Sequence, residues 1–211
     1  MNKVIGVIGG MGPQATVEFY RILIDKSIRE HGAINNDDFP SVVIDSVPVP
    51  DFISSQEHLS QARTMLIDQT KRLNAYGVGR IGIACNTAHI LLDDLRAVSK
   101  VPIVSIMDEA ARIVAQKKIR RIGLFASPVT YRTRLFQASL ENTTAVIIPN
   151  MKMQSDIGDL IRAVIGGKNI NTLKTIAYPL IETFIRKHRV EAIILGCTEL
   201  PLIIDTPMSV P

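Results

Sequence analysis

The two cysteines of this chain stand in similar sequence surroundings. Cys85 follows a short apolar run and precedes Asn86 and Thr87, while Cys197 follows a second apolar run and precedes Thr198. Each is therefore predicted to be the last residue of a buried parallel strand that leads into a helix-like segment. Open α/β sheets bind their ligands at the edge where such strands end. The pair thus marks two candidate sites for chemistry.

A cysteine acts as a base through its thiolate, which is favoured where a strand end faces the N-terminus of a helix. Two thiols on opposite sides of one carbon suit the inversion of a stereocentre. One removes the α-proton of an amino acid and the other delivers a proton to the opposite face. Without pyridoxal phosphate the carbanion is high in energy, so hydrogen-bond donors must hold the α-carboxylate. The alternative is two inert cysteines that pack as small hydrophobes; their matching contexts favour function.

Candidate donors for such a carboxylate follow the predicted strand ends. The backbone amides of residues 9–12 lie in a glycine turn before a helix, which suits an anion, although a purely structural turn is an equal alternative. The side chains of Asn86, Thr87, Thr130 and Thr198 are the other candidates. These groups would stabilise the charge that develops on the carboxylate.

Three further polar residues each allow two interpretations. His89 is close enough to Cys85 in sequence to orient it, or it caps and packs the following helix. Glu199 could bond a substrate ammonium or a backbone group. Asp45 ends the second predicted strand, where it borders the site or caps the loop.

Composition limits the class of protein. The chain has 211 residues, of which 46% are hydrophobic, so a folded core is expected in one large domain or two small ones. A net charge of +4 indicates solubility rather than nucleic-acid binding. We find no signal peptide and no apolar run of about 18 residues, so we expect a cytoplasmic protein without membrane association. Two cysteines without a CxxC motif are too few for a structural zinc site, and we expect no metal.

The apolar pattern alternates between strands and helices, which predicts an α/β fold with mainly parallel sheets. The expected strands are 4–8, 41–46, a strand ending at 85, 102–104, 122–125, 145–148 and a strand ending at 197. Two of the expected helices begin at residues 13 and 130. The others cover 56–76, 87–98, 108–116, 156–165 and 172–188.

The order of elements begins again near Arg121, which indicates a duplication. The interval from Gly6 to Gly123 nearly equals the interval from Cys85 to Cys197. We therefore expect two pseudo-symmetric three-layer α/β domains, and the two cysteines become equivalent residues that could face each other across a cleft.

The expected domains are residues 1–105 and 106–211. In the first half, Lys100-Val101-Pro102 precedes a strand and a helix, whereas the second half reaches the similar Ser209-Val210-Pro211 and stops. We therefore expect a final strand and helix to be missing after residue 211.

Three motifs together resemble the aspartate/glutamate racemase family: Ile8–Pro13, Cys85–His89 and Gly196–Pro201. The resemblance covers nearly the whole chain. It implies a cofactor-independent amino-acid racemase whose active site lies between two pseudo-symmetric α/β domains, with an acidic amino acid as the favoured substrate, and such enzymes are often homodimers. It also implies that Cys85 and Cys197 are the two acid/base residues. The predicted substrate-binding residues are Gly10, Met11, Asn86, Thr87, Thr130, Thr198, Lys168 and Glu199.

The chain departs from the family pattern at one position that matters for the substrate. Many aspartate-racemase-like members have an arginine where this chain has Phe52, and Phe52 cannot pair with a distal carboxylate. Lys168 is the alternative partner, so the substrate could be aspartate, glutamate or a less acidic amino acid.

Two other functions remain alternatives. One is a decarboxylase or cis-trans isomerase of the same superfamily, although the presence of both cysteines argues against a decarboxylase. The other is a non-catalytic amino-acid binding protein that uses the same residues without turnover.

Overall fold

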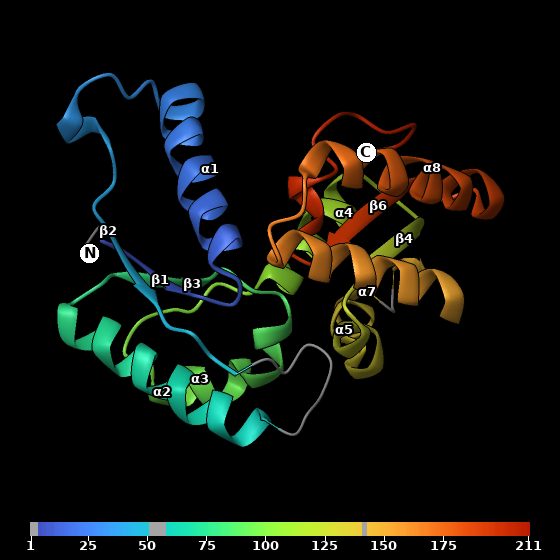
Figure 1. The fold of residues 1–211 in the computed structure, drawn as a ribbon. Helices are drawn as coiled ribbons and strands as arrows, with labels where there is room; N and C mark the ends of the chain where they lie inside the picture. The colour runs from blue at the N-terminus through green and yellow to red at the C-terminus, as the bar shows by residue number, and fades with distance from the viewer. Residues whose placement is uncertain (1–3, 51–57, 141–142) are drawn as a thin grey trace. The chain divides into compact units, whose positions relative to one another are not determined.

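The structure is a computed structural model that describes residues 4–50, 58–140 and 143–211. Two compact units divide the chain, Met1–Ser105 and Ile106–Pro211, and each contains one sheet (Figure 1). Phe52 and the expected start of the helix at residue 56 lie outside the described residues. Each unit is described by itself below.

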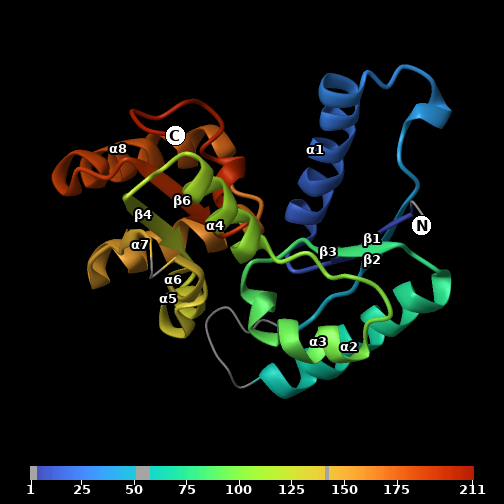
Figure 2. The same cartoon turned by 180° about the vertical axis from the view of Figure 1, so that it is seen from behind.

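The first unit is a parallel sheet covered by helices on both faces. Its strand order is β2-β1-β3, with α1 on one face and α2 and α3 on the other (Figure 2). Its elements are β1 (Ile5–Gly9), α1 (Pro13–His31), the 3₁₀-helix η1 (Asn36–Asp38), β2 (Val42–Ser46), α2 (Leu59–Tyr76), β3 (Arg80–Ile83), the 3₁₀-helix η2 (Thr87–Leu91) and α3 (Leu92–Val98).

The core of this unit lies between the sheet and the helices α2 and α3. Its fully buried side chains include Ile8, Leu66, Ile81 and Leu95. The apolar stripe of α1 is different, because Val17 is 70% exposed and Tyr20 and Ile28 are also exposed. The helical spacing in α1 therefore identifies the helix but not its buried face.

The second unit repeats the same arrangement. Its strand order is β5-β4-β6, again parallel, with the first strand in the middle of the sheet. Its elements are α4 (Ile106–Gln116), β4 (Arg121–Ala126), α5 (Pro128–Thr133), α6 (Leu135–Leu140), β5 (Ala145–Ile147), α7 (Met151–Ile165), α8 (Ile170–His188), β6 (Ala192–Gly196) and the 3₁₀-helix η3 (Leu200–Leu202).

Two separate cores cover the faces of this second sheet. On one face Phe125 packs edge to face on Phe184 of α8, with ring centroids 5.0 Å apart, among apolar residues of α7 and α8. On the other face Leu124 and Phe136 pack with Val114 of α4. These layers confirm the predicted α/β class with parallel sheets, since all strand pairs among the described residues are parallel.

The outer edges of β3 and β6 are paired in the same way. The amide of Ile81 donates to the carbonyl of Pro102 at 2.9 Å, and the amide of Ile193 donates to the carbonyl of Pro211 at 2.8 Å. In the first unit the pairing extends by one bridge, Ile81 to Ile103, where a short strand was expected. The equivalence agrees with the internal duplication inferred from the sequence.

The segments after the two cysteines differ from expectation. The predicted helix 87–98 is divided into the 3₁₀-helix η2 and the short helix α3, and only the three residues of η3 follow Cys197. The helix expected from residue 130 is likewise divided by Arg134, which has a left-handed φ of 55°. The helix-like segments expected after the cysteines thus begin as 3₁₀-helices of five and three residues. Such short helices have only a small dipole, which favours a thiolate less than a long helix would.

Candidate active site

Cys85 lies just past the carboxyl end of β3, in the turn that leads into η2. The turn is attached to the sheet because the amide of Ala84 donates to the carbonyl of Ile8 at 2.9 Å. Cys85 is only 4% exposed and belongs to the same core as Met11 and Ala88. The predicted strand end was therefore correct to within two residues, and the cysteine lies at the carboxyl edge of the sheet.

The residues after Cys85 are buried around it. Asn86 and Thr87 are both buried, and the carbonyl of Asn86 accepts a hydrogen bond from the amide of His89 at 3.1 Å. These contacts close the first turn of η2. Asn86 and Thr87 therefore lie beside Cys85, as required for the predicted donors, and their contact with a substrate stays a prediction.

His89 is held against the backbone of Cys85. Its Nδ1 lies 2.9 Å from the carbonyl oxygen of Cys85, and because a carbonyl only accepts, Nδ1 carries the hydrogen. Burial lowers the pKa of His89 below its ordinary value, against the opposing effect of backbone hydrogen bonds to Cys85, Asn86 and Val104. The neutral imidazole of His89 thus orients the Cys85 turn and is also packed inside the protein. Both roles considered from the sequence, orienting Cys85 and packing, therefore apply.

The glycine turn after β1 is tightly built. Gly10 has a φ of 95°, and a Cβ there would lie 2.2 Å from the carbonyl oxygen of Val47. Its amide donates to Oγ1 of Thr16 at 3.0 Å. The amide of Gly10 is therefore used within the turn. A carboxylate site here would depend on other backbone donors, such as Met11, and the binding role of both residues stays a prediction.

Gln69 of α2 fixes the ends of the two neighbouring strands. Its Nε2 donates to the carbonyl of Gly9 at 3.3 Å and to the carbonyl of Asp45 at 2.8 Å. The Asp45 carboxylate forms an ion pair with Arg72 at 2.8 Å. Asp45 therefore has a structural role at the strand end, which is one of its two sequence interpretations.

Cys197 directly follows β6 and is 5% exposed. The preceding residue, Gly196, is closely packed, because a Cβ there would lie 2.8 Å from Cδ1 of Leu124 and would require that side chain to shift. The Sγ of Cys197 donates to Oε2 of Glu199 at 3.0 Å, and Oγ1 of Thr198 donates to the same oxygen at 3.1 Å. The sequence named these three residues, but it did not predict that Glu199 accepts the thiol hydrogen.

Glu199 is 1% exposed, and only one of its oxygens is used. Its Oε1 is buried and has no hydrogen-bond partner among the residues that the structure describes. A buried acceptor without a partner is costly, so such oxygens commonly meet a ligand or a water. Neither of the predicted partners, an ammonium or a backbone group, bonds this oxygen within the described chain.

Thr130 and Tyr131 follow the end of β4. Thr130 is fully buried, and its hydroxyl lies 3.0 Å from that of Ser127, whose Oγ also accepts the Thr130 amide. Tyr131 accepts from the amide of Ala126 at 2.8 Å and donates to the carbonyl of Leu124. Burial raises the pKa of Tyr131, and the nearby Cys197 raises it further.

Tyr131 was missed by the sequence analysis although it neighbours Cys197. The only available signal was its position in the turn after β4, next to Thr130. The amide of Thr130 takes part in the cap of α5, and its predicted contact with a substrate stays a prediction.

Lys168 lies in the turn between α7 and α8, after Gly166 and Gly167. Its side chain is exposed and lines a hollow between these helices together with Asp156 and Asp159. No described carboxylate forms an ion pair with its ammonium. The second unit thus groups Cys197, Thr198, Glu199 and Tyr131, and it leaves Lys168 on a separate turn.

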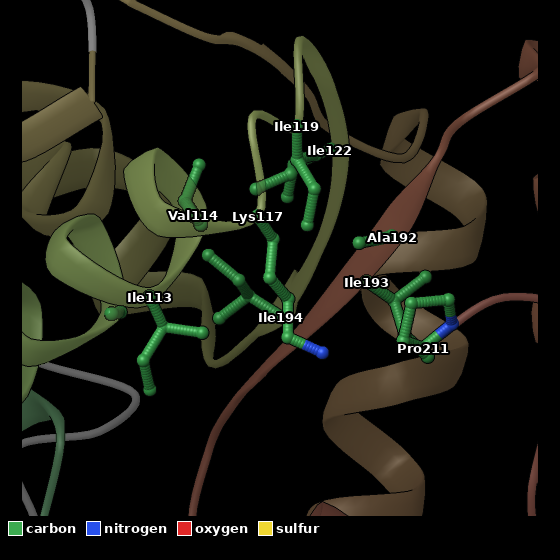
Figure 3. Close-up of a pocket in the computed structure, with 10 residues that line it drawn as sticks. Ile113, Val114, Lys117, Ile119, Ile122, Ala192, Ile193, Ile194 and Pro211 are labelled. Carbon is green, nitrogen blue, oxygen red and sulfur yellow. The ribbon is translucent and has the colours of Figure 1, made fainter.

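The hollow in Figure 3 is a different feature. It is formed by α4, the starts of β4 and β6, and Pro211, and among the described residues that line it Lys117 alone has a charged side chain. Neither cysteine lines it, and we assign no substrate to it.

Within residues 4–50, 58–140 and 143–211, no group of three or more His, Cys, Asp or Glu side chains could hold a metal ion. Over the same residues no helix has both the length and the apolar character to span a bilayer.

Comparison with known proteins identifies the class of protein. A profile of the Asp/Glu/Hydantoin racemase family matches residues 8–209. The broad specificity amino-acid racemase RacX of Bacillus subtilis is 27% identical over 201 residues, which cover 95% of this chain and 87% of that protein.

Solved structures give the same result. An aspartate racemase homologue from Pyrococcus horikoshii superimposes with a TM-score of 0.80 at 30% identity, covering 99% of this chain and 91% of the other. The aspartate racemase of Picrophilus torridus has a TM-score of 0.81 at 28% identity, covering 98% and 88%. The chain belongs to the Asp/Glu/Hydantoin racemase family, and it is therefore an enzyme of the isomerase class.

Proposed function

We propose that this chain racemises an α-amino acid by two-base proton transfer, with Cys85 and Cys197 as the opposed acid and base at Cα. The observation that carries the proposal is the equivalence of the two cysteines. Each is buried in the turn after the edge strand of its own parallel sheet, and the two sheets have the same strand order. Duplication of one unit supplies a matching thiol for each face of a planar carbanion.

The proposed reaction needs no cofactor if the protein stabilises the carbanion. The thiolate of one cysteine takes the α-proton, so the Cα–H bond breaks and an S–H bond forms. The other thiol gives its proton to the opposite face. Hydrogen-bond donors near the cysteines, Asn86 and Thr87, are proposed to hold the α-carboxylate as charge develops on it. Thr198 is proposed to join them by turning its hydroxyl from Oε2 of Glu199, to which it donates at 3.1 Å, toward the substrate.

Glu199 is proposed to receive the substrate ammonium on its unused oxygen. Oε1 is buried without a described partner, and a cationic ammonium would satisfy it with a charge-assisted hydrogen bond. This assignment favours amino acids over their hydroxy-acid analogues, which carry no ammonium.

The substrate is proposed to be acidic, with aspartate or glutamate first. Support comes from the aspartate racemases among the relatives and from Lys168, whose ammonium has no ion-pair partner among the described residues. Support for a wider range comes from the broad-specificity relative and from Phe52 in place of an arginine. The homodimer and the cytoplasmic location stay predictions, and light scattering of the purified protein would test the first.

Single L-amino acids incubated with the protein in deuterium oxide test the reaction. Deuterium at Cα together with loss of optical rotation supports racemisation. Release of carbon dioxide would indicate a decarboxylase, and binding without exchange would indicate a binding protein.

The two-base mechanism is tested by Cys85→Ser and Cys197→Ser, each of which should abolish racemisation because a serine hydroxyl is far less acidic than a thiol. Ile83→Val and Ile194→Val are the matched controls, since each removes one methyl group from the strand beside a cysteine. Full activity in either serine variant would contradict the mechanism.

A further inference from the structure

The two cysteine turns differ in charge at equivalent positions. The residue two places after Cys197 is Glu199, whose carboxyl group accepts the thiol hydrogen at 3.0 Å. The residue two places after Cys85 is Thr87, which carries no charge. The duplicated turns are therefore not equivalent chemically, although they are equivalent in the fold.

Two hydrogen bonds converge on one oxygen of Glu199. Both Cys197 Sγ and Thr198 Oγ1 donate to Oε2, at 3.0 and 3.1 Å. Oε2 is therefore an acceptor, and its bond with Cys197 holds the thiol hydrogen. Cys197 and Glu199 are both buried, so solvent screens this contact little.

A carboxylate at this position opposes ionisation of Cys197. Loss of the thiol proton would remove the S–H···O hydrogen bond and leave two negative charges in a buried turn. Tyr131 of α5 is a further titratable group beside Cys197. Burial raises the pKa of Tyr131 and keeps it neutral, so it supplies no positive charge there.

We infer that Glu199 keeps Cys197 protonated in the resting protein, so that Cys197 is the resting acid and Cys85 the resting base. The inference rests on the proposed racemisation and assigns a proton to each thiol. In the forward step the Cα–H bond breaks as an S–H bond forms on Cys85, and the S–H bond of Cys197 breaks as a new Cα–H bond forms. Cys197 is then a thiolate beside the Glu199 carboxylate.

The resting state must be restored before the next turnover of the same enantiomer. Cys85 loses its proton to water and Cys197 regains one from water, so no net proton is consumed. The enantiomer whose α-hydrogen faces Cys85 reacts with the resting form directly. The opposite enantiomer needs the less stable form, in which Cys85 is protonated and Cys197 is the thiolate. The two enantiomers have equal free energies in water, so kcat/KM must be the same for both. The asymmetry therefore appears as different values of kcat, and of KM, for the two enantiomers.

The proton assignment is measurable without substrate. The pH dependence of alkylation by iodoacetamide, followed for each cysteine by peptide mass spectrometry, gives the pH at which half of each thiol is ionised. Each cysteine is compared with itself across pH, so its limited exposure affects all points equally. In the unmodified protein we expect the midpoint of Cys197 to lie above that of Cys85, and the reverse order would overturn the inference.

Glu199→Gln tests the cause. The substitution keeps the shape of the side chain and removes its charge, so the midpoint of Cys197 should fall by about 1 pH unit or more while that of Cys85 stays unchanged. Glu191→Gln, an exposed glutamate just before β6, should shift neither midpoint. An unchanged Cys197 midpoint in folded Glu199→Gln contradicts the inference.

The order of the two midpoints in the unmodified protein remains decisive if that variant does not fold. Because labelling requires no turnover, it can support the proton assignment even where the deuterium experiment finds no racemisation. The labelling experiment thus tests the proton assignment of the cysteines, and the deuterium experiment tests the racemisation, so the failure of either can be recognised by itself.

Discussion

At the scale of single residues, the two cysteine turns show how a duplicated motif acquires different chemistry. His89 orients the turn of Cys85 through its backbone carbonyl, whereas Glu199 bonds directly to the Sγ of Cys197. The first contact sets the position of a thiol, and the second also sets its charge. Two further residues, Lys168 and His89, can be tested separately from the cysteines.

Lys168→Met should weaken the binding of acidic substrates. The change keeps most of the side-chain length and removes the charge, so loss of a charge-assisted hydrogen bond should raise KM for aspartate about 10-fold or more. KM for alanine should change little, because alanine has no distal carboxylate. Steady-state racemisation of both amino acids provides the measurement.

Lys152→Met is the matched control for this prediction, because Lys152 is an exposed lysine of α7 in the same unit. It should leave both KM values unchanged. Equal increases for aspartate and alanine in Lys168→Met would show that Lys168 does not recognise the distal carboxylate.

His89 predicts a decline of stability in acid. Burial lowers the pKa of His89 in the folded state below its unfolded value of 6.5, so the unfolded chain binds a proton first as the pH falls. The free energy of unfolding should therefore decrease as the pH drops below 6.5, by up to about 1.4 kcal/mol per pH unit from this group. Urea unfolding at a series of pH values measures the decrease.

His89→Gln should be less stable at neutral pH and should show a shallower decrease in acid, since the buried titrating group is absent. His31→Gln, on the exposed end of α1, serves as the control and should keep the wild-type slope. A wild-type slope in His89→Gln would assign the acid sensitivity to other groups.

At the scale of elements, the turn between β1 and α1 determines where the N-terminus of α1 lies. Gly10→Ala should destabilise this turn, because its φ of 95° is strained for alanine and the new Cβ would lie 2.2 Å from the Val47 carbonyl oxygen. We expect a loss of at least about 2 kcal/mol in the free energy of unfolding. Chemical unfolding followed by circular dichroism tests this.

Gly32→Ala separates the strain of the backbone from the steric clash. Gly32 also has a positive φ, of 68°, but no atom lies within 4 Å of the Cβ position. It should lose only about 1 kcal/mol, the cost of the left-handed conformation alone. Equal losses in the two variants would show that the close approach of Val47 does not contribute.

The same turn illustrates which features the sequence could predict. Continuous apolar runs bounded by glycine identified β1 and β6, and Gly77 correctly ended α2, because these signals act over a few neighbouring residues. The partner of the Gly10 amide, Thr16, could not be predicted, since it depends on how tightly the chain closes. A pattern of residue types does not contain that geometry.

Features that depend on packing were also inaccessible from the sequence. The apolar spacing of α1 suggested a buried stripe, yet Val17 and Tyr20 are exposed. The segments that follow the cysteines begin as short 3₁₀-helices, and only after η2 does an α-helix, α3, continue among the described residues. For the site itself, the motifs identified Cys197 and Glu199, but the hydrogen bond between them became visible only in three dimensions.

At the scale of the whole molecule, the repeat relates two units with the same sheet. The strand orders β2-β1-β3 and β5-β4-β6 correspond strand for strand, and Pro102 and Pro211 accept equivalent hydrogen bonds from the edge strands. In the part of the chain that the structure describes, each hydrophobic core is built from residues of one unit. A fold of this kind can keep its scaffold while the residues after each edge strand diverge.

The duplication leads to a prediction about how the two thiols are combined. We propose that both thiols of one site belong to the same chain, so Cys85→Ser and Cys197→Ser variants should remain inactive when they are unfolded together and refolded as a mixture. Each refolded chain would still lack one base. Racemisation of aspartate by the mixture, compared with each variant alone and with wild type treated identically, provides the measurement.

The opposite result has a distinct physical meaning. If sites were built from one cysteine of each of two copies, mixed assemblies would contain a site with both thiols, and activity would reappear on mixing. Refolded wild type controls for recovery of the fold, and the Cys85→Ser, Cys197→Ser double variant controls for residual activity. Activity above that of the single variants would move the proposed two-base site from one chain to a pair of chains, while leaving the proton assignment of Cys197 and Glu199 unaffected.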